Sequence, residues 1–312
     1  MVTEGKVMRS TGSWYVVKMA DGQTINARLR GKFRMEDTGQ TNPIAVGDNV
    51  TVMFEDDEEG AATITEIKDR SNYISREAPR HQYGRHIIAA NIDQAFMIAT
   101  VANPRTSSGF IDRFLLTAEA YHIPGVLVFN KQDLLKKPKD IERQKEWAEM
   151  YRVAGYQVIL ASTVTGEGLQ EVADLLKDKV SLLSGHSGVG KSTLINTIFP
   201  SMNLRIGEIS QKHNKGTHTT TFAEMFDLPT GGYIIDTPGI KEFGILDLQP
   251  QEVGHFYPEI RALLPNCRYS NCLHQEEPGC AVKQAVMDGK LNYERYKNYD
   301  NIVENCKERP KY

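Results

Sequence analysis

The stretch Gly185-His-Ser-Gly-Val-Gly-Lys191-Ser192 decides the fold of this 312-residue chain. It follows the apolar run Val180–Leu183, which predicts a buried strand, and it opens Thr193–Phe199, which predicts a helix. Glycines in such a loop let backbone N–H groups curve around phosphate oxygens at the positive end of a helix. The pattern therefore indicates a P-loop, and the alternative is a plain glycine-rich turn between strand and helix.

In a P-loop the lysine reaches the β and γ phosphates and the following hydroxyl binds Mg²⁺, which are the roles expected of Lys191 and Ser192. The residues expected to contact the nucleotide here are Gly185, His186, Ser187, Gly188, Val189, Gly190, Lys191, Ser192 and Thr193.

Apolar strands alternate with helices from about Asn91 onward, which is typical of a parallel α/β sheet. The expected strands are Gln94–Val101, Val126–Phe129, Gln157–Leu160, Val180–Leu183 and Tyr233–Ile235. The expected helices lie around Ile111–Tyr121, Ile141–Val153 and Leu169–Lys177. The middle of the chain is therefore expected to form an α/β P-loop domain.

The segment Asn130, Lys131, Gln132 and Asp133 follows the expected strand Val126–Phe129 directly. The carboxylate of Asp133 can accept from both the N1–H and the 2-amino group of guanine, which adenine does not offer. After the next strand, a backbone N–H at Ala161 or Ser162 can meet guanine O6. Such a four-residue motif also suits an ordinary loop, but beside a P-loop it predicts a guanine nucleotide.

The segment Asp236-Thr-Pro-Gly239 follows the expected strand Tyr233–Ile235. In P-loop NTPases an aspartate at this place holds Mg²⁺, usually through water, and the glycine N–H meets the γ-phosphate. The polar stretch before it contains Thr219, Thr220 and Thr221. One of these threonines is expected to ligate Mg²⁺, and we assign this role to Thr220. A plain Asp-Thr-Pro-Gly turn is the alternative.

The base-reading motif ends at Asp133, before the phosphate loop at Gly185, whereas ordinary GTPases have the reverse order. Because an active site needs its loops adjacent in space and not in chain order, a circular permutation satisfies this arrangement. The segment that senses the γ-phosphate then leads straight into the last unit of the chain. We therefore expect nucleotide state to be transmitted to that unit.

Ile240 follows Gly239 where many GTPases carry a glutamine that orients the attacking water. An isoleucine cannot position water, so another group is needed. His218 is the nearest candidate along the chain, and an ordinary loop histidine is the alternative. We expect slow intrinsic turnover that a partner accelerates.

The first seventy residues predict five short strands and no helix, which suits a small OB-like β-barrel. The expected strands are Lys6–Met8, Trp14–Met19, Thr24–Leu29, Asn49–Phe54 and Ala62–Ile67. Residues 1–35 carry seven basic side chains and two acidic ones. The cations Arg28, Arg30, Lys32 and Arg34 alternate, so a strand would present them on one face, either to RNA or simply to solvent.

The last sixty residues hold Cys267, Cys272, His274 and Cys280, a complete Cys₃His set with no open position. That set predicts one structural zinc ion, with a disulfide as the alternative. Cys306 is left over, buried or simply unpaired, unless it replaces one of these ligands. The following tyrosines at three-residue spacing predict a helix packed on the zinc unit, in preference to base stacking.

The composition, with 37 basic and 40 acidic residues and 40% hydrophobic residues, is that of a globular protein of more than one domain. The first ten residues lack the apolar stretch of a secretory signal, and no run approaches 18 apolar residues. We therefore expect a cytoplasmic protein without a membrane segment. The net charge of −3 is a sum over the whole chain that includes the basic barrel, so it does not exclude a nucleic-acid partner.

These motifs in this order resemble the ribosome small subunit-dependent GTPases of the RsgA (YjeQ) family. The resemblance implies an OB-fold RNA-binding domain over residues 1–70, a circularly permuted GTPase domain over 71–245 and a mostly helical zinc domain over 246–312. It also implies binding to the small (30S) ribosomal subunit and its rRNA, assistance in late maturation, and GTP hydrolysis that the subunit stimulates and that is coupled to release. We expect a monomer that uses Mg²⁺ with GTP.

The resemblance supports His218 as the residue that positions water. Lys191 and Thr220, assigned above to the phosphates and to Mg²⁺, are the other expected catalytic groups. Two other interpretations stay open. A P-loop kinase needs only Gly185–Ser192, but Asn130–Asp133 argues against it. An RNA-binding scaffold that uses GTP only as a conformational ligand is conceivable because of Ile240.

Overall fold

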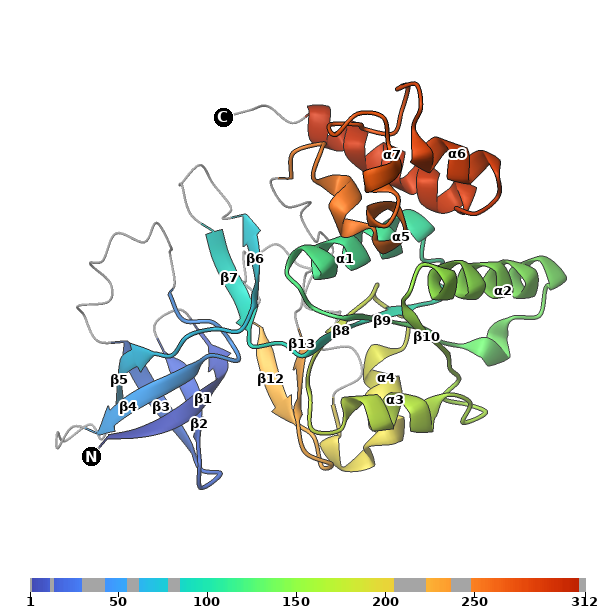
Figure 1. The fold of residues 1–312 in the computed structure, drawn as a ribbon. Coiled ribbons are helices and arrows are strands. Elements are labelled where there is room, and N and C mark those ends of the chain that lie inside the picture. Colours follow the sequence, from blue (N-terminus) through green and yellow to red (C-terminus); the bar gives the residue numbers. More distant parts are fainter. Residues whose placement is uncertain are drawn as a thin grey trace. The chain divides into compact units, whose positions relative to one another are not determined.

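The computed structural model describes residues 2–11, 14–29, 43–54, 62–77, 85–204, 223–236 and 248–308 (Figure 1). The chain groups into two compact units. The first contains residues 1–95, 173–184 and 195–240, and the second contains residues 96–172, 185–194 and 241–312. Each unit therefore gathers segments that are far apart in the sequence.

The first unit begins with a five-stranded barrel, drawn in blue in Figure 1. Its strands are β1 (Val2–Ser10), β2 (Tyr15–Met19), β3 (Thr24–Leu29), β4 (Asn49–Phe54) and β5 (Ala62–Ile67). They follow the order β1-β2-β3-β5-β4, and β4 pairs back with β1, which closes the barrel. Alternate side chains such as Val7, Val17 and Val52 fill its interior and are fully buried. The expected OB-like barrel is confirmed, with β1 longer than Lys6–Met8.

The same unit contains the strands β11 (Val180–Ser184), β12 (Glu224–Asp227) and β13 (Tyr233–Asp236). Strands β11 and β13 are parallel, whereas β12 runs antiparallel both to β13 and to β1 of the barrel. Strand β12 and the two-stranded sheet of β6 (Tyr73–Glu77) and β7 (Arg85–Ala90) were not expected from the sequence. These strands mix polar and apolar residues, so they lack the uniform apolar signal of a buried strand.

The second unit contains β8 (Gln94–Ala99), β9 (Gly125–Phe129) and β10 (Gln157–Leu160), in the order β10-β9-β8. Strands β9 and β10 are parallel, as expected. Strand β8 is buried throughout but ends at Ala99, so the expected strand Gln94–Val101 was two residues too long. Helices α1 (Ser108–Ala120) and α2 (Pro138–Val153) pack on these strands, with Trp147 against Phe129.

The helices α3 (Leu169–Leu176) and α4 (Lys191–Ile198) lie close to their expected positions. None of the helices in the described part of the chain combines the length and the apolar character that a membrane crossing needs.

The end of the chain belongs to the second unit and is mostly helical, with α5 (Pro258–Arg261), α6 (Ala281–Met287) and α7 (Tyr293–Glu308). Its apolar core includes Val253, Ile260 and Val303, and Leu116 of α1 belongs to the same core. The helix with regularly spaced tyrosines packs on the cysteine-rich segment, as expected, because the hydroxyls of Tyr296 and Tyr299 donate to its backbone carbonyls.

A buried arginine joins α7 to α1. The guanidinium of Arg295 is 2% exposed and pairs with Asp112 of α1, and its Nε donates to Glu259 at 2.6 Å. The ring of Tyr257 lies 4.4 Å from the guanidinium carbon. The two carboxylates hold the pKa of Arg295 well above its usual range although burial opposes this, so the arginine stays charged.

Replacing Arg295 by methionine is expected to destabilise the protein by about 3–5 kcal/mol, because it leaves the buried carboxylate of Asp112 without a cation. Urea denaturation measures this loss. Lys297→Ala, at an exposed position of the same helix, is the matched control. Adding Asp112→Asn to Arg295→Met is expected to restore part of the stability. A loss no larger than that of Lys297→Ala would show that the pair contributes nothing.

Candidate functional site

The glycines of the loop between β11 and α4 have backbone conformations that other residues rarely adopt. The φ angles are 140° at Gly185, 82° at Gly188 and 96° at Gly190. A Cβ at Gly185 would lie 2.2 Å from the carbonyl oxygen of Ile98, and one at Gly190 would lie 2.6 Å from Nδ2 of Asn130. The loop therefore needs glycine both for its backbone angles and for its close packing.

Two lysine ammonium groups converge on the carbonyls of this loop. Nζ of Lys191, the first residue of α4, donates to the carbonyls of Gly185 at 2.6 Å and His186 at 3.0 Å. Nζ of Lys131 donates to the carbonyl of Gly188 at 2.6 Å. Two cations beside a loop at a helix N-terminus make a local environment that favours phosphate.

The expected base-reading residues lie against the same loop although they are more than fifty residues earlier in the chain. Nδ2 of Asn130 donates to the carbonyl of Val189 at 2.9 Å. Its Oδ1 is buried and accepts no hydrogen bond from any described residue. Such an orphaned buried acceptor is uncommon and indicates that a further group completes the site.

Asp133 joins this segment to the third expected loop. The hydroxyl of Ser162 donates to Oδ1 of Asp133 at 2.6 Å, and the backbone N–H of Gln132 donates to the carbonyl of Ala161 at 3.2 Å. The structure therefore brings together the phosphate loop, Asn130–Asp133 and Ala161–Ser162 within the second unit. Lys191, Ser192 and Thr193 form the first turn of α4, with Ser192 buried and Thr193 exposed.

Asp236 is the last residue of β13 and is 9% exposed. It lies opposite Leu183 in the parallel pair of β13 with β11, two residues before the phosphate loop begins. It belongs to the first unit. The aspartate thus ends the strand next to the one that leads into the phosphate loop, as expected.

Several expected site residues lie outside the described part of the chain. They are Thr219, Thr220, Thr221, His218, Gly239 and Ile240 near the nucleotide, and Arg30, Lys32 and Arg34 in the basic stretch. Arg28 is described at the end of β3, where it is exposed and its guanidinium carbon lies 4.0 Å from the ring centre of Trp14.

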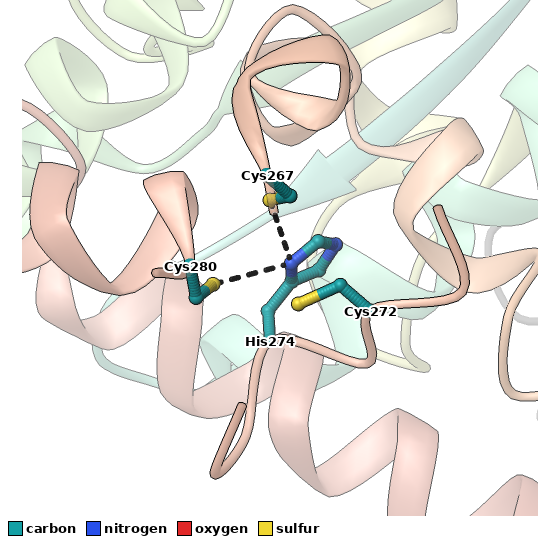
Figure 2. A group of neighbouring side chains, drawn as sticks. All are labelled: Cys267, Cys272, His274 and Cys280. Atoms are coloured by element: carbon teal, nitrogen blue, oxygen red, sulfur yellow. Dashed lines mark hydrogen bonds between the residues drawn. The ribbon is translucent and has the colours of Figure 1, made fainter. Parts of the chain in front are cut away.

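The four expected metal ligands lie together in the C-terminal segment (Figure 2). Their ligand atoms are all within 4.8 Å of one another. Nδ1 of His274 lies 3.6 Å from Sγ of Cys267 and 3.4 Å from Sγ of Cys280, and Sγ of Cys272 completes the group. Three sulfurs and one imidazole nitrogen, mostly buried, fit a tetrahedral metal ion such as zinc.

Burial raises the pKa of Cys272 to about 12, so this thiol needs a cation beside it to become a thiolate ligand. Sγ of Cys280 also accepts from the backbone N–H of Lys283 at 3.4 Å and so caps the start of α6. Cys306 is buried on α7 and is not one of the four grouped ligands.

One contact of the phosphate loop was not expected from the sequence. The ring of Phe110, in the first turn of α1, stacks on the imidazole of His186 with 4.0 Å between ring centres. The two residues are far apart in the chain and belong to no common motif, so no local pattern pointed to this pair.

Family models match most of the chain. The RsgA N-terminal domain matches residues 4–62, and the RsgA GTPase matches residues 67–246. A small ribosomal subunit biogenesis GTPase RsgA of Phocaeicola vulgatus is 50% identical over 309 residues, which cover 99% of this chain and 98% of the relative. A protein of the same description from Bacteroides fragilis is 47% identical with the same coverage.

Solved structures agree with these relatives. The crystal structure of YjeQ from Thermotoga maritima matches with a TM-score of 0.80 and 33% identity, covering 99% of this chain and all of the other. YloQ, described as a circularly permuted GTPase, matches with a TM-score of 0.74 and 31% identity over 100% of this chain and 98% of the other. The circular permutation expected from the order of the motifs is therefore confirmed. The chain belongs to the RsgA family of circularly permuted GTPases.

Proposed function

We propose that this chain binds the small ribosomal subunit, assists its late maturation, and hydrolyses GTP in a reaction that the subunit stimulates and that is coupled to release. The relatives that it matches over nearly its whole length are small ribosomal subunit biogenesis GTPases. These relatives support the ribosomal part of the proposal. The observation that supports the GTP part is the hydrogen bond from Asn130 to Val189, because it joins the expected base-reading segment to the expected phosphate loop. A P-loop kinase needs no such junction.

GTP would lie with its base on Asp133 and its phosphates on the loop at Gly185. The carboxylate of Asp133 accepts from guanine N1–H and the 2-amino group, and a backbone N–H at Ala161 or Ser162 meets O6. The glycine-rich backbone and Lys191 bind the β and γ phosphates. Base and phosphate recognition by the same unit accounts for the need to bring these distant segments together.

Three residues would hold Mg²⁺: Ser192, Thr220 and Asp236. When bound, Mg²⁺ neutralises charge on the β and γ phosphates. Buried Ser192 lies at the start of α4, and Asp236 ends the strand paired with β11. Gly239, three residues after Asp236, donates its N–H to the γ-phosphate in this proposal.

Hydrolysis requires a group that orients the attacking water, and Ile240 cannot supply it. His218 takes this role, while Lys191 neutralises charge that develops on the phosphates. Intrinsic turnover is therefore slow, and contact with the small subunit accelerates it.

We expect His218→Ala to reduce subunit-stimulated turnover by about 100-fold or more, because the attacking water is no longer oriented; a loss of this size is typical when a side chain that acts on the reacting group is removed. Affinity for GDP should stay unchanged because the histidine is not assigned to base or phosphate binding. Phosphate release with and without purified small subunits measures turnover, and a fluorescent GDP titration measures affinity. His213→Ala, in the same polar stretch, is the matched control. Full stimulated activity of His218→Ala would contradict the assignment.

The Cys₃His group would bind one zinc ion as a structural site, because four protein ligands leave no open coordination position. The barrel would contact rRNA phosphates through the exposed Arg28 and through Arg30, Lys32 and Arg34. The proposed domains are residues 1–70, 71–245 and 246–312, which the family matches over 4–62 and 67–246 support. Such a protein acts in the cytoplasm, as a monomer.

A further inference from the structure

The phosphate loop is in contact with the first turn of helix α1. The rings of His186 and Phe110 are stacked, with an angle of 27° between their planes. The backbone N–H of Phe110 donates to Oγ of Ser107, which caps the helix and fixes its first turn. The phosphate loop is therefore in direct contact with a capped first turn of α1.

Two residues beyond Phe110, helix α1 is bound to α7 through Asp112. This carboxylate is fully buried and accepts from Arg295, from Nδ2 of Asn298 at 2.6 Å and from the hydroxyl of Tyr151 at 2.7 Å. A buried, multiply hydrogen-bonded charge tolerates few alternative arrangements, so this contact fixes α1 against α7.

A second junction ties the same two helices. Oγ of Ser108 donates to Oε1 of Glu294 at 2.5 Å, and the indole N–H of Trp147 donates to the other oxygen of that carboxylate at 3.0 Å. Glu294 lies in the first turn of α7. The start of α1 is thus fixed to the start of α7 at two neighbouring positions.

Helix α7 in turn holds the backbone of the metal-ligand segment. The hydroxyl of Tyr296 donates to the carbonyl of His274 at 2.7 Å, and that of Tyr299 donates to the carbonyl of Leu273 at 3.1 Å. His274 has a φ of 60°, which is unusual for a residue other than glycine, so its backbone needs such support. The orientation of this ligand consequently depends on α7.

We propose that helix α1 couples the phosphate loop to the Cys₃His group, so that nucleotide and metal each raise the affinity of the chain for the other. The path runs from His186 through Phe110, Asp112 and Arg295 to His274. It rests on the proposed function for the nucleotide, and it is separate from the chain connection that leads out of Gly239. Because closely packed groups shift between discrete arrangements, a loop held by nucleotide favours one arrangement of α7.

The test is an equilibrium competition for Zn²⁺ between the full chain and a chromogenic chelator, with Mg²⁺ present throughout and with or without saturating GDP. We expect GDP to raise the affinity for Zn²⁺ by about fivefold or more, the lower end of typical coupling between sites. Thermodynamic reciprocity requires the affinity for fluorescent GDP to fall by the same factor when Zn²⁺ is removed.

Variants of Phe110 isolate the path. Phe110→Leu removes the ring stack and is expected to abolish the effect of GDP on Zn²⁺ affinity, while the affinity without nucleotide stays unchanged. Phe110→Tyr keeps an aromatic ring and should retain the coupling. Lys297→Ala, at an exposed position of α7, should behave as the unmodified chain.

Two results would overturn the coupling: GDP that binds without changing Zn²⁺ affinity, or full coupling in Phe110→Leu. Failure of the proposed function gives a different result, because the zinc-loaded chain would then not bind GDP at all. The proposed coupling would be excluded in that case as well.

Discussion

Asp133→Ala is expected to weaken binding of GDP and GTP by about a thousandfold, because two guanine N–H groups lose a charged acceptor worth about 1.5–3 kcal/mol for each hydrogen bond. In the structure this carboxylate is already held in place by the hydroxyl of Ser162 at 2.6 Å. A fluorescent GDP titration measures the loss. Glu142→Gln, at an exposed position of the following helix α2, is the matched control and should not change the affinity.

Asp133→Asn provides a sharper test, because it is expected to change which base the protein prefers and not only to lower the affinity for GDP. An amide at this position offers one donor and one acceptor, which suits a base with a carbonyl in place of the 2-amino group. We therefore expect the variant to bind xanthosine diphosphate more tightly than GDP. If it still prefers GDP, or if Asp133→Ala binds GDP normally, the guanine is not read by this carboxylate.

The two loops proposed to bind the nucleotide could be recognised in the sequence because each is a local pattern that directly follows an apolar strand. Gly185–Ser192 needs its glycines for positive φ angles, and Asn130–Asp133 needs a specific set of side chains, so both requirements appear in the sequence itself. The meeting of the two loops followed from the chemistry of one nucleotide, and the hydrogen bond from Asn130 to Val189 agrees with it.

The connection between α1 and α7 was not predictable in this way. Asp112 and Arg295 are separated by 183 residues, and charged residues are rarely buried unless they are paired, so nothing in either local segment marks them. The stack of Phe110 on His186 was also not predictable, because the two residues are far apart in the chain and neither local segment marks the contact. Strand β12 was missed because a charged residue stands at each of its ends and only two apolar residues lie between them, so it lacks the apolar run of a buried strand.

Removing the metal is expected to unfold the C-terminal segment from residue 248 to residue 308. Structural zinc contributes about 10–16 kcal/mol in small zinc-binding peptides, which is as large as the whole stability of a typical domain, about 5–15 kcal/mol. Three of the four ligands are buried, and Cys272 and Cys280 belong to the same apolar core as Val303 of α7. Without the cation, buried sulfurs and a strained His274 backbone would have to be accommodated together.

Hydrogen exchange after treatment with a zinc chelator measures this unfolding, and Cys280→Ser should reproduce it because it removes one of the three sulfur ligands, while the serine hydroxyl can still accept the N–H that caps α6. Amides of α6 and α7 are expected to lose protection by at least 100-fold, whereas those of the barrel strands β1–β5 keep theirs. Cys306→Ser is the matched control, since this buried cysteine lies outside the ligand group. If α6 and α7 stay protected after chelation, the buried network around Arg295 suffices to hold this segment, and the metal serves another purpose than folding.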